Sequence, residues 1–204
     1  MGGSVPKQYI KIEGLPVLVK TVRVFCTVKD VSRIVVMCPE GGRKYCEDLL
    51  AEYLHACTSG IGVFPVVMVR EGGPTRQQTV ARALSYIDPE SSFVLVHDGA
   101  RPYVTHKIIE DVTGALECGA DAAVPCVRPK NTIRTDRITL DRSSLYEVQT
   151  PQGFRTGVLR EAVKRAEKEG FEVFGVCCKT CSVNKKELHL KQVRPEQVRH
   201  HLQH

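Results

Sequence analysis

Short runs rich in Val and Ile alternate along the chain with longer amphipathic segments, and this alternation constrains the fold more than any other feature. The clearest runs lie at residues 32–38, 63–69, 92–98 and 121–127. They are nearly continuous in apolar character, which is typical of strands buried on both faces of a parallel sheet. The pattern therefore predicts right-handed strand–helix–strand crossovers and a doubly wound, Rossmann-like α/β sheet.

The segments between these runs have helical patterns. They lie at about residues 15–25, 43–57, 76–86, 105–118 and 155–169. Ligands of doubly wound sheets bind beyond the carboxyl ends of the strands, so the polar residues that follow each apolar run are the candidates for chemistry. Because no internal repeat or low-complexity linker interrupts the alternation, we expect one domain over residues 1–181, followed by a divergent basic tail at 182–204.

Composition narrows the class of protein. The chain has 204 residues, of which 42% are hydrophobic and 25% charged, as in ordinary globular domains, and we expect no membrane span. Half of the net charge of +6 lies in the tail, which contains five Lys and Arg residues and two Glu residues. We therefore expect a solvated end and no nucleic-acid partner. The nine cysteines are odd in number and no secretion signal is visible, which indicates free thiols in a reducing compartment.

The stretch 128–145 departs from the alternation of strands and helices. It is polar, with short β-branched alternations, and it is typical of an extended arm rather than of a core element. A surface hairpin and a dimerisation arm are equally consistent with this pattern.

The segment REGGPTRQQTV, residues 70–80, follows an apolar run and opens a helix. Gly72 and Gly73 allow a ligand to approach the backbone closely, and the helix start offers unpaired N–H groups. Arg76 and the hydroxyl of Thr79 fall in the first helical turn. Taken alone, the pattern favours an ordinary glycine turn before a helix, and a site where these N–H groups meet an acceptor is the alternative.

The segment VLVHDGARPYV, residues 94–104, places an acid and a base at the end of another strand. Asp98 and Arg101 are three residues apart, so they can hold hydrated Mg²⁺ and a phosphate or hydroxyl group side by side. A structural ion pair between the two side chains is the alternative.

Six motifs together identify a family. VPKQY, GGPTRQQTV, VLVHDGARPYV, NTIR, TLDRSSL and VQTPQGF follow one another from about Gly3 to Gly170. In this order and spacing the chain resembles the 2-C-methyl-D-erythritol 4-phosphate cytidylyltransferases, also called 4-diphosphocytidyl-methylerythritol synthases. The run TLDRSSLYEVQTPQGF favours this family over the ribitol-phosphate cytidylyltransferases, which share the fold and the strand end.

On the nucleotide side, the resemblance implies roles for five residues. Lys7 matches the catalytic lysine that neutralises the phosphates of CTP in the transition state. Gly73 and Thr79 match positions that read the cytosine, and Arg76 lies in the same loop. Asp98 matches a residue at the junction of the two substrates, near a Mg²⁺ ion.

On the substrate side, Asp98 and Arg101 match the strand-end pair that faces methylerythritol phosphate. Thr132, Arg142 and Thr150 match groups that hold this substrate. In the family Arg142 lies on an arm that crosses to the partner subunit and takes part in catalysis, so the resemblance implies a homodimer.

The implied reaction needs no protein nucleophile. An oxygen of the substrate phosphate attacks the α-phosphorus of CTP and pyrophosphate leaves. Positioning and cancellation of phosphate charge then provide the catalysis.

Both ends of the chain depart from the resemblance. The family has a strand and a loop of the type AAGxGxRMG before PKQY, whereas this chain starts at Met1-Gly2. We therefore expect the first strand of the sheet, its phosphate-cradling glycines and one arginine to be missing. After Gly170 the sequence also diverges from the family.

Two alternatives to the implied function follow from these departures. One is a cytidylyltransferase for ribitol phosphate or another polyol phosphate, and the other is a non-catalytic remnant. The expected location is cytoplasmic in a bacterium and the plastid in a plant or alga.

Overall fold

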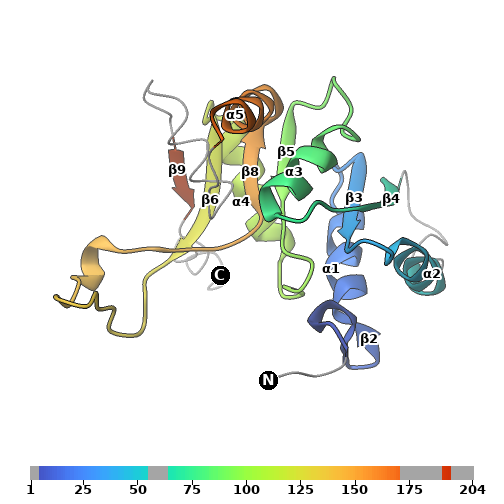
Figure 1. The fold of residues 1–204 in the computed structure, drawn as a ribbon, viewed down its shortest axis with the longest axis horizontal. Helices are drawn as coiled ribbons and strands as arrows, with labels where there is room; N and C mark the ends of the chain where they lie inside the picture. Colours follow the sequence, from blue (N-terminus) through green and yellow to red (C-terminus); the bar gives the residue numbers. More distant parts are fainter. Residues whose placement is uncertain (1–4, 55–63, 171–189, 194–204) are drawn as a thin grey trace, which may run out of the picture.

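The computed structural model describes residues 5–54, 64–170 and 190–193 (Figure 1). The helices and 3-10 turns are η1 (Lys7–Tyr9), α1 (Val17–Cys26), α2 (Arg43–Leu54), α3 (Arg76–Leu84), α4 (His106–Glu117), η3 (Arg142–Ser144) and α5 (Thr156–Glu169). The strands are β1 (Lys11–Ile12), β2 (Leu15–Pro16), β3 (Arg33–Cys38), β4 (Val66–Glu71), β5 (Phe93–Val96), β6 (Ala122–Val127), β7 (Glu147–Val148), β8 (Gln152–Arg155) and β9 (Leu190–Val193). Among these described residues, no helix is long and apolar enough to cross a membrane.

The α/β architecture predicted from the apolar runs is confirmed, because β3, β5 and β6 lie within three of the runs and β4 overlaps the fourth. β3 and β4 pair in parallel, with Arg33 opposite Val66. A second sheet has the order β5-β8-β6-β7, and β9 pairs in parallel with β6. Residues 190–193, within the predicted tail, thus contribute a strand.

β8 has no counterpart among the predicted strands. It lies antiparallel between β5 and β6, with Phe154 opposite both Val94 and Ala122. The chain leaves the sheet along β6, forms the arm, and returns through β7 and β8, so the returning strand must run in the opposite direction. Its sequence, QGFR, is too short and too polar for hydrophobic patterning to detect.

Helices cover both faces of the sheet formed by β5, β8 and β6. Phe154 and Ala122 pack with Leu159 of α5 and Val80 of α3 on one face. Ala123 of β6 packs against α4 on the other, so successive residues of one strand serve opposite layers. Most of these side chains are fully buried, which makes this layered core the rigid base for the strand ends.

β3 and β5 are not hydrogen-bonded neighbours. β3 pairs with β4 and β5 with β8, and within the described chain the other edge of each strand has no ladder partner. A groove of about 1110 Å³ lies between them and is lined by both strands, by α1 and by α3. Unpaired N–H and C=O groups on two such edges are the positions at which a further strand adds to a sheet.

The contact between α4 and β8 generates a stability prediction. A Cβ atom on Gly153 of β8 would lie 2.5 Å from Cγ1 of Val112 and 3.0 Å from Cδ1 of Leu116. Both neighbours are buried residues of α4, so Gly153→Ala should lower the free energy of unfolding by about 1–3 kcal/mol. Urea denaturation measures this change.

Gly157→Ala in α5 is the matched control. A Cβ atom there has nothing within 4 Å, and alanine is the better helix former, so the free energy of unfolding should stay unchanged or rise. Equal stability of the Gly153→Ala protein and the wild type would contradict the close seating of α4 on β8.

Candidate active site

The loop from Gly72 to Thr79 connects the carboxyl ends of three strands. The N–H of Gly72 donates a 2.8 Å hydrogen bond to the carbonyl of Cys38, which joins the ends of β4 and β3. The N–H of Gly73 donates to Oγ1 of Thr79 at 3.0 Å, so the predicted glycine and threonine are in direct contact. The hydroxyl of Thr79 also donates to carbonyl oxygens of the loop, those of Gly73 and Thr75.

Helix α3 begins where the sequence predicts. Thr75 is its N-cap, and its hydroxyl accepts a hydrogen bond from the N–H of Gln78 in a capping box. A Cβ atom on Gly73 would lie only 2.4 Å from Cβ of Gln78, so the loop can lie this close to the helix only with glycine at that position. The helix start therefore holds Arg76 at the strand ends.

Asp98 lies between two guanidinium groups. Its Oδ1 accepts a 2.7 Å hydrogen bond from Nη1 of Arg76, and its Oδ2 accepts a 3.1 Å bond from Nε of Arg101. Burial by itself would raise the pKa of the Asp98 carboxyl, but the hydrogen bond and charge of Arg76, followed by the charge of Arg101, lower it on balance. The carboxylate is therefore ionised at neutral pH and joins the start of α3 to the turn that follows β5.

The predicted magnesium role of Asp98 stays a prediction. Both carboxylate oxygens already accept hydrogen bonds from arginines. Over the described residues no three His, Cys, Asp or Glu side chains are grouped so that they could hold a metal ion. Mg²⁺ commonly depends on substrate phosphates for its remaining ligands, and we assign it no step here.

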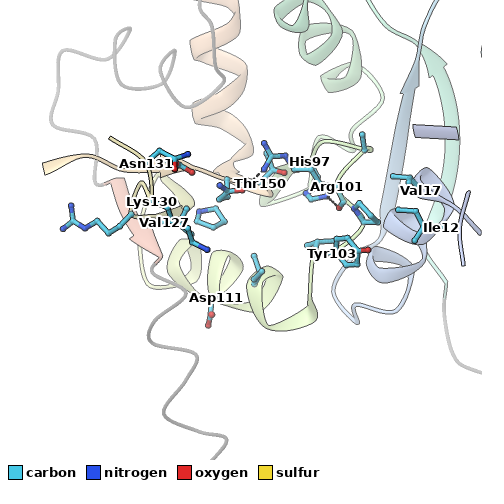
Figure 2. A pocket seen from close by; sticks show the side chains of 18 residues that line it. Ile12, Val17, His97, Arg101, Tyr103, Asp111, Val127, Lys130, Asn131 and Thr150 are labelled. Carbon is cyan, nitrogen blue, oxygen red and sulfur yellow. Dashed lines mark hydrogen bonds between the residues drawn. The ribbon is translucent and has the colours of Figure 1, made fainter. Parts of the chain in front are cut away.

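A pocket of about 850 Å³ opens beside Arg101 (Figure 2). Figure 2 shows Arg101 and Thr150 near its centre, with Lys130 and Asn131 from the base of the arm on one side and Tyr103 on the other. Guanidinium, ammonium, amide and hydroxyl groups thus line one cavity. Such donors suit a ligand with both phosphate and hydroxyl groups.

The structure brings together six of the predicted site residues. Gly73 lies in the loop before α3, Arg76 and Thr79 lie in the first turn of α3, Asp98 and Arg101 follow β5, and Thr150 precedes β8. The N–H of Asp98 donates to Oγ1 of Thr150 at 3.5 Å, which brings Thr150 to the same strand end. These six are grouped as expected, and their roles toward ligands stay predictions.

The other three predicted residues lie elsewhere. Lys7 is exposed in η1, although its neighbours Gln8 and Tyr9 line the groove that also reaches Asp98. Thr132 is exposed at the start of the arm. Arg142 is exposed in η3, where its Nη1 donates to the carbonyl of Lys130 at 2.9 Å.

The arm itself projects from the sheet, as the sequence predicts. Figure 1 shows the yellow and orange segment extending away from the layered core, with the short turn of η3 near its far end. An isolated bridge between Arg134 and Thr139 closes it into a hairpin. Arg142 therefore lies on an extension rather than at the strand ends of its own chain.

Two residues beside the site were not singled out from the sequence. The ring of His97 packs against Phe25 at 5.2 Å between centroids, and its Nε2 lies 3.0 Å from the carbonyl oxygen of Arg101. Gln149 accepts a 2.6 Å hydrogen bond from Nη1 of Arg101 through its Oε1. Both residues stand inside the motifs VLVHDGARPYV and VQTPQGF, which is the signal that could have identified them.

Comparison with known proteins gives the same assignment as the motifs. The sequence pattern of the family IspD, 2-C-methyl-D-erythritol 4-phosphate cytidylyltransferase, matches residues 1–176. A protein of that name from Bacillus velezensis is 40% identical over 173 residues, which is 81% of this chain and 69% of the relative. Another from Bacillus mycoides is 38% identical over 176 residues, 84% of this chain and 74% of the relative.

The chain belongs to the 2-C-methyl-D-erythritol 4-phosphate cytidylyltransferase family.

Solved structures of proteins named as members of this family have the same fold. The 4-diphosphocytidyl-2C-methyl-D-erythritol synthase of Anaerococcus prevotii superposes with a TM-score of 0.79 at 24% identity, covering 95% of this chain and 82% of that one. The 2-C-methyl-D-erythritol 4-phosphate cytidylyltransferase of Thermus thermophilus gives a TM-score of 0.71 at 28% identity, covering 92% and 83%. The predicted Rossmann-like nucleotidyltransferase fold is therefore confirmed.

The partly buried ring of His97 leads to a prediction on pH. Burial lowers the pKa of His97 from the ordinary value of 6.5. At a pH between the pKa of His97 in the folded chain and its pKa in the unfolded chain, only the unfolded chain binds the proton. The free energy of unfolding should therefore fall as the pH falls. His97→Gln retains an N–H donor but does not titrate, so the stability of the wild type relative to this variant should decrease from pH 7.5 to pH 5.5.

Urea denaturation of both proteins at the two pH values measures this difference. The pKa of Asp98 is lowered from 3.8, so this carboxylate stays ionised over the whole pH range in both proteins, and the comparison isolates the contribution of His97. A relative stability that rises toward acid pH would contradict a neutral, buried ring.

Proposed function

We propose that this chain transfers the cytidylyl group of CTP to 2-C-methyl-D-erythritol 4-phosphate and releases pyrophosphate, a reaction of the non-mevalonate route to isoprenoids. The observation that carries the proposal is the carboxylate of Asp98, held by Arg76 of the nucleotide loop and by Arg101 of the adjoining pocket. Transfer between two bound phosphates requires their sites to be adjacent, and this shared contact makes them so.

On the nucleotide side, Gly73 and Thr79 read the base and Arg76 stays at the junction. The glycine lets the loop lie directly against the start of α3, and the Thr79 hydroxyl holds the loop closed. Lys7 supplies positive charge to the triphosphate. An oxygen of the acceptor phosphate forms a bond to the α-phosphorus while the bond to the bridging oxygen of pyrophosphate breaks.

On the acceptor side, Arg101 and Thr150 hold the polyol phosphate in the pocket of Figure 2, and Thr132 contributes from the start of the arm. Arg142 completes this site from the arm of a second subunit, so the active form is a homodimer. Loss of one well-placed charge stabiliser such as Lys7 or Arg142 typically raises the activation free energy by about 2.7–4 kcal/mol. Mg²⁺ enters the proposal only as a companion of the triphosphate, since the described residues offer no ligand cluster.

The open edges of β3 and β5 favour a second candidate function, nucleotide binding without turnover. The groove between these two strands is lined by Arg76 and Asp98. A change in the positions of the strands would therefore affect the proposed nucleotide residues before the acceptor residues. A cytidylyltransferase that acts on ribitol phosphate would differ from the first candidate in its acceptor substrate, and from the second in having turnover.

Turnover tests the first proposal. With Mg²⁺ and 2-C-methyl-D-erythritol 4-phosphate, CTP should release pyrophosphate far faster than UTP or ATP, because we propose that Gly73 and Thr79 read the cytosine. The assay compares the 204-residue chain with a version that carries an added strand and glycine-rich loop, designed to pair with the open edges of β3 and β5, which should be faster.

The outcomes separate the candidates. Equal rates with all three nucleotides would contradict the assignment, and faster turnover of ribitol 5-phosphate would favour the other polyol. CTP binding by calorimetry with no pyrophosphate from either version would favour the non-catalytic function.

Exchange between subunits tests the role of the arm. Arg142→Ala and Lys7→Ala should each lower the turnover rate about 10²–10³-fold without changing the melting temperature, because both side chains are exposed. A mixture of the two variants should regain activity, since a heterodimer contains one intact site.

Native mass spectrometry shows whether heterodimers are present in the mixture. Heterodimers without any recovered activity would contradict the shared site and indicate that each site is built from one chain.

A further inference from the structure

The guanidinium group of Arg101 is held in a defined position although its side chain is half exposed. Its Nε donates to Oδ2 of Asp98 at 3.1 Å and its Nη1 donates to Oε1 of Gln149 at 2.6 Å. An unrestrained arginine retains large rotamer entropy, which must be lost whenever the side chain binds a ligand. Two partners at different nitrogens remove that freedom before a ligand arrives.

Gln149 is itself anchored by its backbone. Its N–H donates a 2.8 Å hydrogen bond to the carbonyl of Pro125 at the carboxyl half of β6. The next residue, Thr150, accepts from the N–H of Asp98. The pair Gln149-Thr150 thus contacts the turn 98–101 at both ends, and the partly buried Gln149 side chain is directed along the wall of the pocket.

The chemistry of the Gln149 side chain matters as much as its position. Arg76, Asp98 and Arg101 form a cluster of two cations and one anion, so one positive charge remains in excess. A carboxylate at position 149 would cancel that charge. The neutral amide oxygen orients the guanidinium and leaves its charge available to an anion in the pocket.

We propose that Gln149 is a positioning residue, which holds the Arg101 guanidinium toward the phosphate-bearing acceptor without neutralising it. The inference deepens the proposed function and rests on it for the identity of the acceptor. Gln149 acts through Arg101 and determines the affinity for the acceptor rather than for CTP.

Steady-state kinetics of three variants test the proposal. Gln149→Leu has a similar size and no acceptor atom, so the KM for 2-C-methyl-D-erythritol 4-phosphate should rise about tenfold to a hundredfold while the KM for CTP stays unchanged. Gln149→Glu keeps the hydrogen bond but cancels the charge, and should also raise the KM for the acceptor. Val148→Ala, at an exposed neighbour on the same segment, should change neither constant.

A double-mutant cycle distinguishes positioning from direct contact. In an Arg101→Ala background, Gln149→Leu should have no further effect on the KM for the acceptor, because the group it positions is absent. An undiminished effect in that background would overturn the proposal. So would a Gln149→Leu protein whose KM values both equal those of the wild type.

A spectroscopic measurement keeps the inference testable even if no turnover is found. The side-chain Nε–H resonance of Arg101, assigned in ¹H–¹⁵N spectra by its loss in Arg101→Ala, should be sharp in the wild type and in Val148→Ala. It should broaden or exchange with water in Gln149→Leu. A resonance unchanged in Gln149→Leu would overturn the positioning role, whereas absent turnover with the expected spectra would count against the proposed function alone.

Discussion

The carboxylate of Asp98 is shared by two arginines that come from different loops, and the geometry of the candidate site depends on this contact. Arg76 reaches it from the start of α3 and Arg101 from the turn that follows β5. About a quarter of the Asp98 side chain is exposed, at 27%, so the pair of contacts is only partly screened by water. Loss of the anion would leave two guanidinium groups facing each other, and their repulsion would separate the start of α3 from the turn that follows β5.

The same contact also joins the two sheets. Because β3 and β5 share no ladder among the described strands, side chains must hold their ends together. Arg76 makes the bond to Asp98 at the carboxyl ends, and the hydroxyl of Thr21 donates to the carbonyl of Gly99 at 3.1 Å. Arg33 donates to the carbonyl of Tyr86 at 2.8 Å near the amino end of β3. The site is thus built across a junction where polar contacts replace backbone pairing.

Much of the framework could be read from local patterns. Strands β3 to β6 follow from continuous apolar runs, and α3 begins at Thr75 because a capping box, Thr-x-x-Gln, specifies that position. β8 could not be read in this way, since its four residues owe their place to pairing on both edges and to Gly153, which admits α4. Pairing partners distant in sequence leave no periodic signal in a short segment.

The sequence by itself determined the α/β class, the family and the identity of the polar residues at the strand ends, because hydrophobic periodicity and motif spacing are local properties. Only the tertiary structure decided which of these residues meet. It placed Asp98 between two cations, where a sequence pattern equally allows a metal ligand, and it brought Gln149 to Arg101 across 48 positions of sequence separation. It also placed Arg142 on the projecting arm. Such distinctions depend on distances between atoms of separate elements, and those distances are set by packing rather than by any local preference of the chain.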